Sequence, residues 1–156
     1  MADVAAQAGV ARGTLYRYFP SREVLLDELA HVAAASAGAR LAAARLDEVA
    51  AREGIVRAVR AFLDAGDAFI AIAREHTRST RFDELVAGPL RRLVERAQAE
   101  GQLRDDISAP WLAESLLALT VALVVTSPNV GREDAVALIS GLYLDGAHAR
   151  PLPIPS

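Results

Sequence analysis

Apolar residues in this sequence recur three or four positions apart, the spacing that places side chains on one face of an α-helix. The first such stretch covers residues 2–8 and ends at Gly9, a residue type that adopts the left-handed conformation after a helix without steric cost. The helical spacing resumes from Arg12 to Tyr18, with Leu15 inward, and Pro20 cannot continue that helix. The pattern therefore predicts two short helices joined by a tight turn.

A long helix is predicted from Ser21 to about Ala44, because serine is a favourable N-cap and a helical apolar stripe follows it. The residues expected to point inward along the first half of this helix are Leu25, Leu26, Leu29 and Val32. Such a helix would connect the two short helices to the rest of the chain.

A second long helical region is predicted from Asp47 to about Glu75. Gly54 or Gly66 is expected to bend it, because glycine costs about 1 kcal/mol relative to alanine inside a helix. The remaining helices are predicted at residues 82–87, 89–100, 111–125 and 133–146. Gly88 is expected to end the short helix at residues 82–87.

The first two helices and the start of the third resemble the DNA-binding segment of TetR-family transcriptional regulators. The matching features are the Gly9-Val10 turn, the Gly13–Tyr16 run, the Tyr18-Phe19 pair and the residues Pro20–Glu23 before the long helix. This joint match over about 22 positions is more specific than any of its parts. The resemblance implies an all-α fold, in which a helix-turn-helix head is attached to a helical ligand-binding and dimerisation body.

On this basis we assign residues 1–24 to the head, residues 25–150 to the body and the proline-rich residues 151–156 to a tail. Members of the family place a further helix before the motif, so we expect part of the head's apolar face to lack its cover and the chain as given to bind DNA weakly. Ala11 stands where the family usually has serine or threonine, which removes an N-cap worth about 1 kcal/mol.

The resemblance also assigns a DNA-binding surface. Its residues are Arg12, Thr14, Tyr16, Arg17, Tyr18 and Arg22. Arg12 and Thr14 would face base edges, since arginine can contact guanine at two atoms and threonine can meet a thymine methyl. The two tyrosines and Arg22 would contact phosphates. Two alternatives stay open: Arg17 as a solvated charge, and Tyr18 packed against the absent first helix.

The net charge of −3 conceals an uneven distribution along the chain. Residues 1–22 carry three arginines and one aspartate, a balance of +2, which leaves −5 for the remaining residues. A basic head on an acidic body fits a nucleic-acid contact at one end, although three arginines are few enough for chance to account for them.

The last two predicted helices are apolar around more of their circumference than a single core requires. A helix that is apolar on all sides must be covered on all sides. We therefore predict a symmetric homodimer formed through a four-helix bundle, with core helices of a monomer as the alternative. The predicted interface residues are Ser115, Ala118, Ala122, Leu138 and Leu142.

A small-molecule site is implied by the resemblance and is only loosely specified by the sequence. The candidate lining residues, each of which could equally be plain core, are Phe62, Phe69, His76, Phe82, Trp111 and Thr120. His76 lies in a polar stretch and could also be exposed to solvent. A mostly apolar lining with few charges favours a hydrophobic or amphipathic effector.

Enzymatic function is not indicated. The three histidines are far apart and lack metal-binding spacing, and no nucleophile, P-loop or dinucleotide motif is present, so we expect no catalytic residues, no metal and no cofactor.

The chain has no cysteine, which excludes disulfides. No secretory signal is recognisable, and the longest apolar run, residues 116–125, is short for a membrane span, so we expect a cytoplasmic protein without a membrane partner.

The sequence therefore predicts a ligand-responsive repressor that binds a palindromic DNA operator as a homodimer and is released by a small-molecule effector. The alternative is a dimeric module that binds a small molecule or a partner protein and does not bind DNA, because the first helix of the head is absent.

Overall fold

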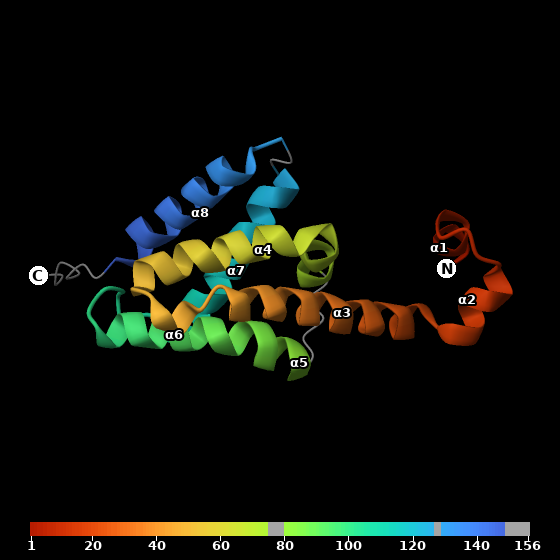
Figure 1. Cartoon of the computed structure of the whole chain (residues 1–156), viewed down its shortest axis with the longest axis horizontal. Coiled ribbons are helices and arrows are strands. Elements are labelled where there is room, and N and C mark those ends of the chain that lie inside the picture. The colour runs from red at the N-terminus through yellow and green to blue at the C-terminus, as the bar shows by residue number, and fades with distance from the viewer. Residues whose placement is uncertain (75–79, 127–128, 149–156) are drawn as a thin grey trace, which may run out of the picture.

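The computed structural model describes residues 1–74, 80–126 and 129–148, with the backbone alone for residues 67–74. Within these ranges the chain forms helices joined by short turns, together with one isolated bridge between Leu103 and His148. Two short helices stand at the N-terminal end of a long helix, and the other helices gather around the opposite end of that helix (Figure 1). The all-α prediction is confirmed.

The elements follow one another in a simple order. They are α1 (Ala2–Gln7), α2 (Arg12–Tyr18), α3 (Arg22–Ala43), the 3-10 turn η1 (Leu46–Glu48), α4 (Ala51–Arg74), α5 (Thr80–Phe82), the π-helical turn η2 (Asp83–Ala87), α6 (Gly88–Ala99), α7 (Ala109–Thr126) and α8 (Arg132–Ala147). The predicted tail, residues 151–156, lies outside the described residues.

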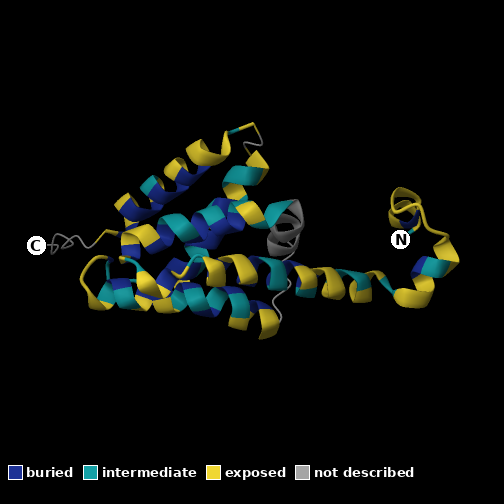
Figure 2. Cartoon of the chain, in the orientation of Figure 1, coloured by how far each residue is buried: buried dark blue, intermediate teal, exposed yellow. Residues whose placement is uncertain are grey.

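The core of the body lies between α4 and the helices around it, which are α3, α6, α7 and α8 (Figure 2). Its largest fully buried side chains include Phe62 and Ile55 of α4, Leu90 and Leu93 of α6 and Leu116 of α7. Burying side chains of this size stabilises the fold by about 1.5–3 kcal/mol each. The body thus has a well-defined apolar core.

The C-terminal half of α3 approaches its neighbours closely because its inward face is made of small residues. Its buried alanines are Ala30, Ala33, Ala34 and Ala37, and Gly38 follows them. At Gly38 the π-helical turn η2 comes so close that a Cβ atom would lie 2.7 Å from the Cβ atom of Leu85 and 3.2 Å from its carbonyl oxygen. Glycine is therefore needed at this contact.

The C-terminal end of α3 is anchored by arginines from two other helices. Arg57 of α4 donates a hydrogen bond of 3.1 Å to the carbonyl oxygen of Ala44, the residue that caps α3. Arg96 of α6 donates to the carbonyl oxygens of Leu46, Asp47 and Val49 in the turn that follows, at 2.8–2.9 Å. Hydrogen bonds from charged donors are stronger than neutral ones, so this end of α3 is fixed to the body.

The bend expected in the second long helical region occurs at Gly66, which has φ 80° and ψ −175° inside α4. Beside it, Arg132 at the start of α8 donates to the carboxylate of Asp64, and Arg60 donates to Glu133 at 2.7 Å. The hydrogen bond from Arg60 is the main cause that lowers the pKa of Glu133. The ion pair between Arg60 and Glu133, which links α4 to α8, is therefore present at neutral pH and is lost only as the pH falls through the lowered pKa of Glu133.

Two predictions about helix faces and ends are wrong. Leu29 and Val32 were expected inward, but they are 45% and 60% exposed, because the N-terminal half of α3 extends beyond the body and the alanine face points inward instead. Gly88 does not end a helix. It has right-handed helical geometry, and its N–H donates to the carbonyl oxygen of Asp83, so η2 continues directly into α6.

α7 is longer than the apolar run from which a membrane span was excluded. Its residues Ala109–Thr126 are long and apolar enough to cross a membrane by length and composition, and about a third of them are buried in the chain. One face of α7 packs against α4, α6 and α8. The other face is exposed, and a protein partner can cover it as well as lipid can.

The contact between Gly38 and Leu85 yields a stability prediction. Gly38→Ala should destabilise the protein by about 1–3 kcal/mol, because the added methyl overlaps an atom next to the backbone of a packed neighbour. Gly146→Ala is the matched control, since it also adds a methyl to a helix but meets nothing within 4 Å. Urea unfolding followed by circular dichroism measures both. An equal or raised stability of Gly38→Ala would show that α3 and η2 are not in close contact.

Candidate functional site

The head consists of α1, a tight turn and α2. Gly9 has φ +66°, the left-handed conformation that glycine adopts without strain, and Val10 donates to the carbonyl oxygen of Ala5 at 3.0 Å to close the turn. Ala5 and Leu15 are the buried apolar residues of the two helices. Val4 and Val10 stay 42% and 41% exposed. The helix-turn-helix layout is thus present, with a small core of its own.

The two helix starts in this region differ in their caps. Ala11 precedes α2 with an extended backbone, φ −64° and ψ 139°, and makes no side-chain hydrogen bond to the helix. Ser21 precedes α3, and its hydroxyl accepts a hydrogen bond of 3.2 Å from the N–H of Val24. The predicted cap at Ser21 and the predicted loss of a cap at Ala11 are both confirmed.

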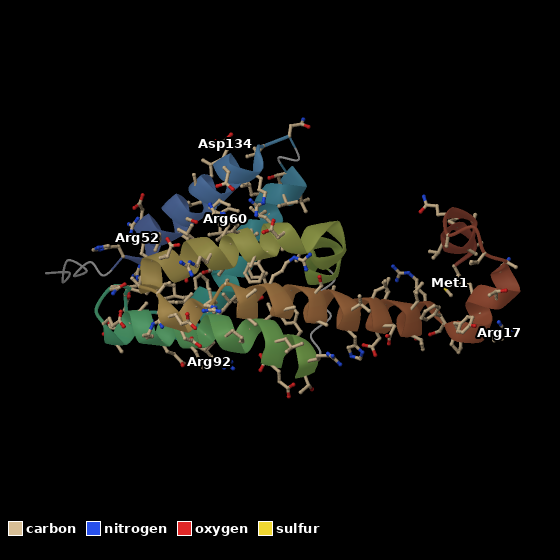
Figure 3. All side chains as sticks on the ribbon, in the orientation of Figure 1. Met1, Arg17, Arg52, Arg60, Arg92 and Asp134 are labelled. Carbon is tan, nitrogen blue, oxygen red and sulfur yellow. The ribbon has the colours of Figure 1, made fainter. Side chains whose placement is uncertain are left out.

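α2 presents its polar side chains away from Leu15. Arg12, Arg17 and Arg22 are exposed. Arg17 follows Leu15 by two positions, which is a rotation of about 200° around the helix axis, so it lies on the side of α2 roughly opposite Leu15. Tyr16 and Tyr18 are 39% and 66% exposed. Thr14 is half-buried. Figure 3 shows Arg17 at the end of the molecule that is farthest from the body.

Two cation–π contacts order this surface. The guanidinium carbon of Arg12 lies 5.7 Å from the ring centre of Tyr16, and that of Arg17 lies 5.2 Å from the ring centre of Tyr18. Such contacts stabilise an exposed pair by about 0.5–1 kcal/mol. The predicted DNA-binding residues of α2 therefore form two arginine–tyrosine pairs, while Arg22 begins the next helix.

Beyond α3, the large apolar residues that are exposed in the described part of the body lie on α7 and α8. Leu138 and Leu142 of α8 are 55% and 66% exposed, although they are large and apolar. On α7, Ala118 and Ala122 are exposed and Ser115 is half-buried. These are the five residues predicted for the dimer interface.

The predicted ligand residues do not form one group. Phe62, Phe82 and Thr120 are buried, and the hydroxyl of Thr120 donates to the carbonyl oxygen of Leu116 at 2.9 Å. Trp111 is 62% exposed at the start of α7, so its side chain does not line the interior of the body. The side chain of Phe69 and the whole of His76 lie outside the described residues.

Sequence reasoning missed Ser140 of α8. Its hydroxyl is buried and, within the described structure, has no hydrogen-bond partner, which costs about 1–3 kcal/mol. The nearby phenol of Tyr143 does have a partner, the carbonyl oxygen of Leu112 at 3.0 Å, and burial raises the pKa of Tyr143 above its ordinary value. The sequence pattern shows that Ser140 lies on the inward face of a helix, but it does not show whether the hydroxyl has a partner.

A known protein family has a segment similar to the head. Residues 1–29 match the family model of bacterial regulatory proteins of the tetR family. No protein with curated annotation matches the sequence.

Solved structures with the same fold cover nearly the whole chain. A bacterial regulatory protein in the tetR family from Rhodococcus RHA1 matches with a TM-score of 0.74 and 16% identity, over 96% of this chain and 86% of that one. A candidate tetR-family transcription regulator from Shewanella sp. PV-4 matches with a TM-score of 0.67 and 20% identity, over 96% and 87% of the two chains. A TetR transcriptional regulator from Streptomyces coelicolor has 25% identity and a TM-score of 0.50, over 95% and 86%.

Proposed function

We propose, on the premise that the chain is a TetR-family transcriptional regulator by its N-terminal match and its fold, that it is a ligand-responsive repressor. It binds a palindromic DNA operator as a homodimer in the cytoplasm, and a small-molecule effector releases it. Members of this family regulate transcription and are not enzymes. The expectation that the chain is not an enzyme agrees with this membership.

The exposed surface of α2 is the observation that carries the DNA-binding proposal. It combines two arginines and two tyrosines on one short helix that stands clear of the body, and Arg22 follows at the start of α3. The +2 balance of residues 1–22 attracts a phosphate backbone, whereas the −5 balance of the remaining chain repels it. DNA is therefore expected to contact the head and to avoid the body.

The residues of this surface have different roles in the proposal. Arg12 and Thr14 read base edges in the major groove, where an arginine can bind guanine through two hydrogen bonds. The tyrosine hydroxyls and Arg22 contact phosphates and set the position of the helix. Arg17 adds positive charge on the outermost side of α2. The two cation–π pairs reduce the number of side-chain conformations that DNA binding must fix.

The exposed face of α7 and α8 supports a homodimer. Large apolar residues rarely stay more than half exposed in a group on a monomer, and here Leu138 and Leu142 do so beside a helix with small exposed residues, Ala118 and Ala122. Small residues let two helices approach closely. A two-fold pairing of this face would form a four-helix bundle and present two heads to two half-sites.

Effector binding is proposed for the interior of the body. The buried hydroxyl of Ser140, which has no hydrogen-bond partner among the described residues, and the buried Phe62 and Thr120 together favour a mainly apolar molecule with a hydrogen-bonding group. A molecule that displaces Leu85 would act on α3 at Gly38 and so change the position of the head. The factor by which such an effector lowers DNA affinity cannot exceed the ratio of the effector's affinities for the two positions of the head.

A second candidate function is a dimeric binding module that does not bind DNA. It is favoured by one observation, the small core of the head, in which Val4 and Val10 remain more than 40% exposed. The DNA measurements described next separate the two candidates.

Single substitutions in the head should separate base contacts from phosphate contacts. The measurement is fluorescence anisotropy at several salt concentrations, with duplexes selected from a random palindromic pool. Arg12→Ala should remove a preference of about 1–3 kcal/mol at one base pair in each half-site. Arg22→Gln should weaken binding to all duplexes and reduce the slope of log affinity against log salt by about one per subunit.

Arg92→Gln is the control for charge, because Arg92 is an exposed arginine of α6 in the body. It should change neither the preference nor the salt slope. If the protein prefers no duplex over random DNA, the repressor proposal fails and the DNA-independent module remains.

A charge placed in the exposed face of α8 should abolish dimerisation. Leu142→Arg would bury an unpaired guanidinium in the proposed interface, and analytical ultracentrifugation should then show a monomer where the unmodified protein is a dimer. Val32→Arg is the matched control, because Val32 is similarly exposed at 60% but lies on α3. A dimer that persists in Leu142→Arg would place the interface elsewhere.

A further inference from the structure

A cavity lies at the end of the body that is opposite the head. Its volume is about 340 Å³, and it is lined by residues from three separate segments. They are Ala51, Arg52 and Ile55 of α4, Gly101, Gln102 and Leu103 after α6, and Leu144 and His148 at the end of α8. Figure 3 shows Arg52 at this end and Arg17 of the head at the other. The volume is within the range of about 300–1,000 Å³ that small-molecule sites occupy.

The cavity has an apolar wall and a polar rim. Ile55, Leu103 and Leu144 belong to the core, with exposures of 0%, 3% and 6%, so Ile55 forms the closed floor and only Leu103 and Leu144 leave a small apolar surface open to the cavity. Arg52 and Gln102 are exposed at the rim. This division suits a molecule with one apolar part and one polar end.

The charges around the cavity favour a ligand whose polar end is negatively charged. None of the eight lining residues is an aspartate or a glutamate. Glu53 accepts a hydrogen bond from Arg57 at 2.9 Å, and Glu100 accepts one from Gln102 at 2.7 Å. Among the described residues no carboxylate pairs with Arg52. Arg52 is also in the first turn of α4, which runs from Ala51 to the bend at Gly66, and the helix dipole favours a negative charge there.

The cavity walls are held by hydrogen bonds to backbone carbonyl oxygens. The N–H of Arg104 donates to the carbonyl oxygen of Ala147 at 2.9 Å, and Leu103 and His148 form an isolated bridge. Gln98 of α6 donates to the carbonyl oxygens of Arg104 and Ile107, at 2.7 and 2.8 Å. The segment after α6 is thus tied both to α8 and to its own helix. A preformed site of this kind binds without a large ordering cost.

We propose that this cavity is a second small-molecule site, which binds an amphipathic carboxylate. The carboxylate pairs with the guanidinium of Arg52, and the apolar chain lies against the open surface of Leu103 and Leu144. The site is separate from the DNA-binding head and from the effector site proposed for the interior of the body. It depends on neither of them.

The test uses octanoate as the probe and the full chain without DNA, so that a failure to bind DNA has no effect on the result. Isothermal titration calorimetry should show one octanoate bound per chain, and 1-octanol, which has the same chain length and no charge, should bind about tenfold more weakly. Amide chemical shifts should change at residues 51–55, 101–103 and 144. Equal binding of octanol, or shifts confined to the region of Phe62 and Thr120, would overturn the proposal.

Variants of Arg52 test the anion contact directly. Arg52→Gln should weaken octanoate binding about tenfold and leave octanol binding unchanged, because only the carboxylate loses its partner. Arg52→Lys keeps the charge and should restore most of the affinity. Arg92→Gln removes an exposed arginine that is not in the cavity and should have no effect. Since Arg52 and Arg92 are both exposed, the fold should persist in all three variants, and unchanged octanoate affinity in Arg52→Gln would contradict the proposal.

Discussion

The structure depends on the close packing of α3 against the body through a face made of alanine and glycine. Ala33, Ala34 and Ala37 are almost completely buried, and Gly38 allows η2 to approach to a distance that no side chain would permit. Beyond this face Arg57 and Arg96 hold the chain by its carbonyl groups. One end of α3 is therefore fixed, whereas its other end carries the head.

This arrangement makes α3 a lever with a short arm and a long arm. Gly38 lies six residues from the anchored Ala44, about 9 Å at 1.5 Å per residue, and Arg22 lies 22 residues from it, about 33 Å. If α3 turns as a rigid rod about its anchored end, a movement of about 1 Å at Gly38 becomes about 3–4 Å at Arg22. In the proposed dimer both heads would move, so a small change at Leu85 would alter the spacing of the two proposed half-site contacts.

Features set by local backbone chemistry could be predicted from the sequence. The turn at Gly9 and the N-cap at Ser21 each follow from what one residue allows its own backbone to do, and a bend was predicted at Gly54 or Gly66, of which Gly66 adopts it. The inward face of α3 could not be predicted in this way, because helical periodicity does not say which of two apolar faces has a neighbour. Leu29 and Val32 were chosen for their size, whereas the body packs against the smaller alanines.

The DNA-binding surface and the cavity at Arg52 also differ in how far the sequence could predict them. The arginines and tyrosines of α2 are within seven residues of one another, so a sequence motif was sufficient to group them. The cavity at Arg52 joins segments that are about 50 residues apart in the chain, and nothing in the sequence indicates that they meet. Trp111 shows the opposite error, since a large aromatic residue was assigned to the interior and is mostly exposed.

Hydrogen exchange along α3 tests the lever most directly. If the anchored end is part of the core and the other end is free, the amides of residues 34–43 should exchange only through global unfolding. Those of residues 24–29 should exchange at least about tenfold faster, through local opening. Equal protection along the whole helix in the DNA-free protein would contradict this account, because α3 would then be held along its length and could not carry the head as a lever.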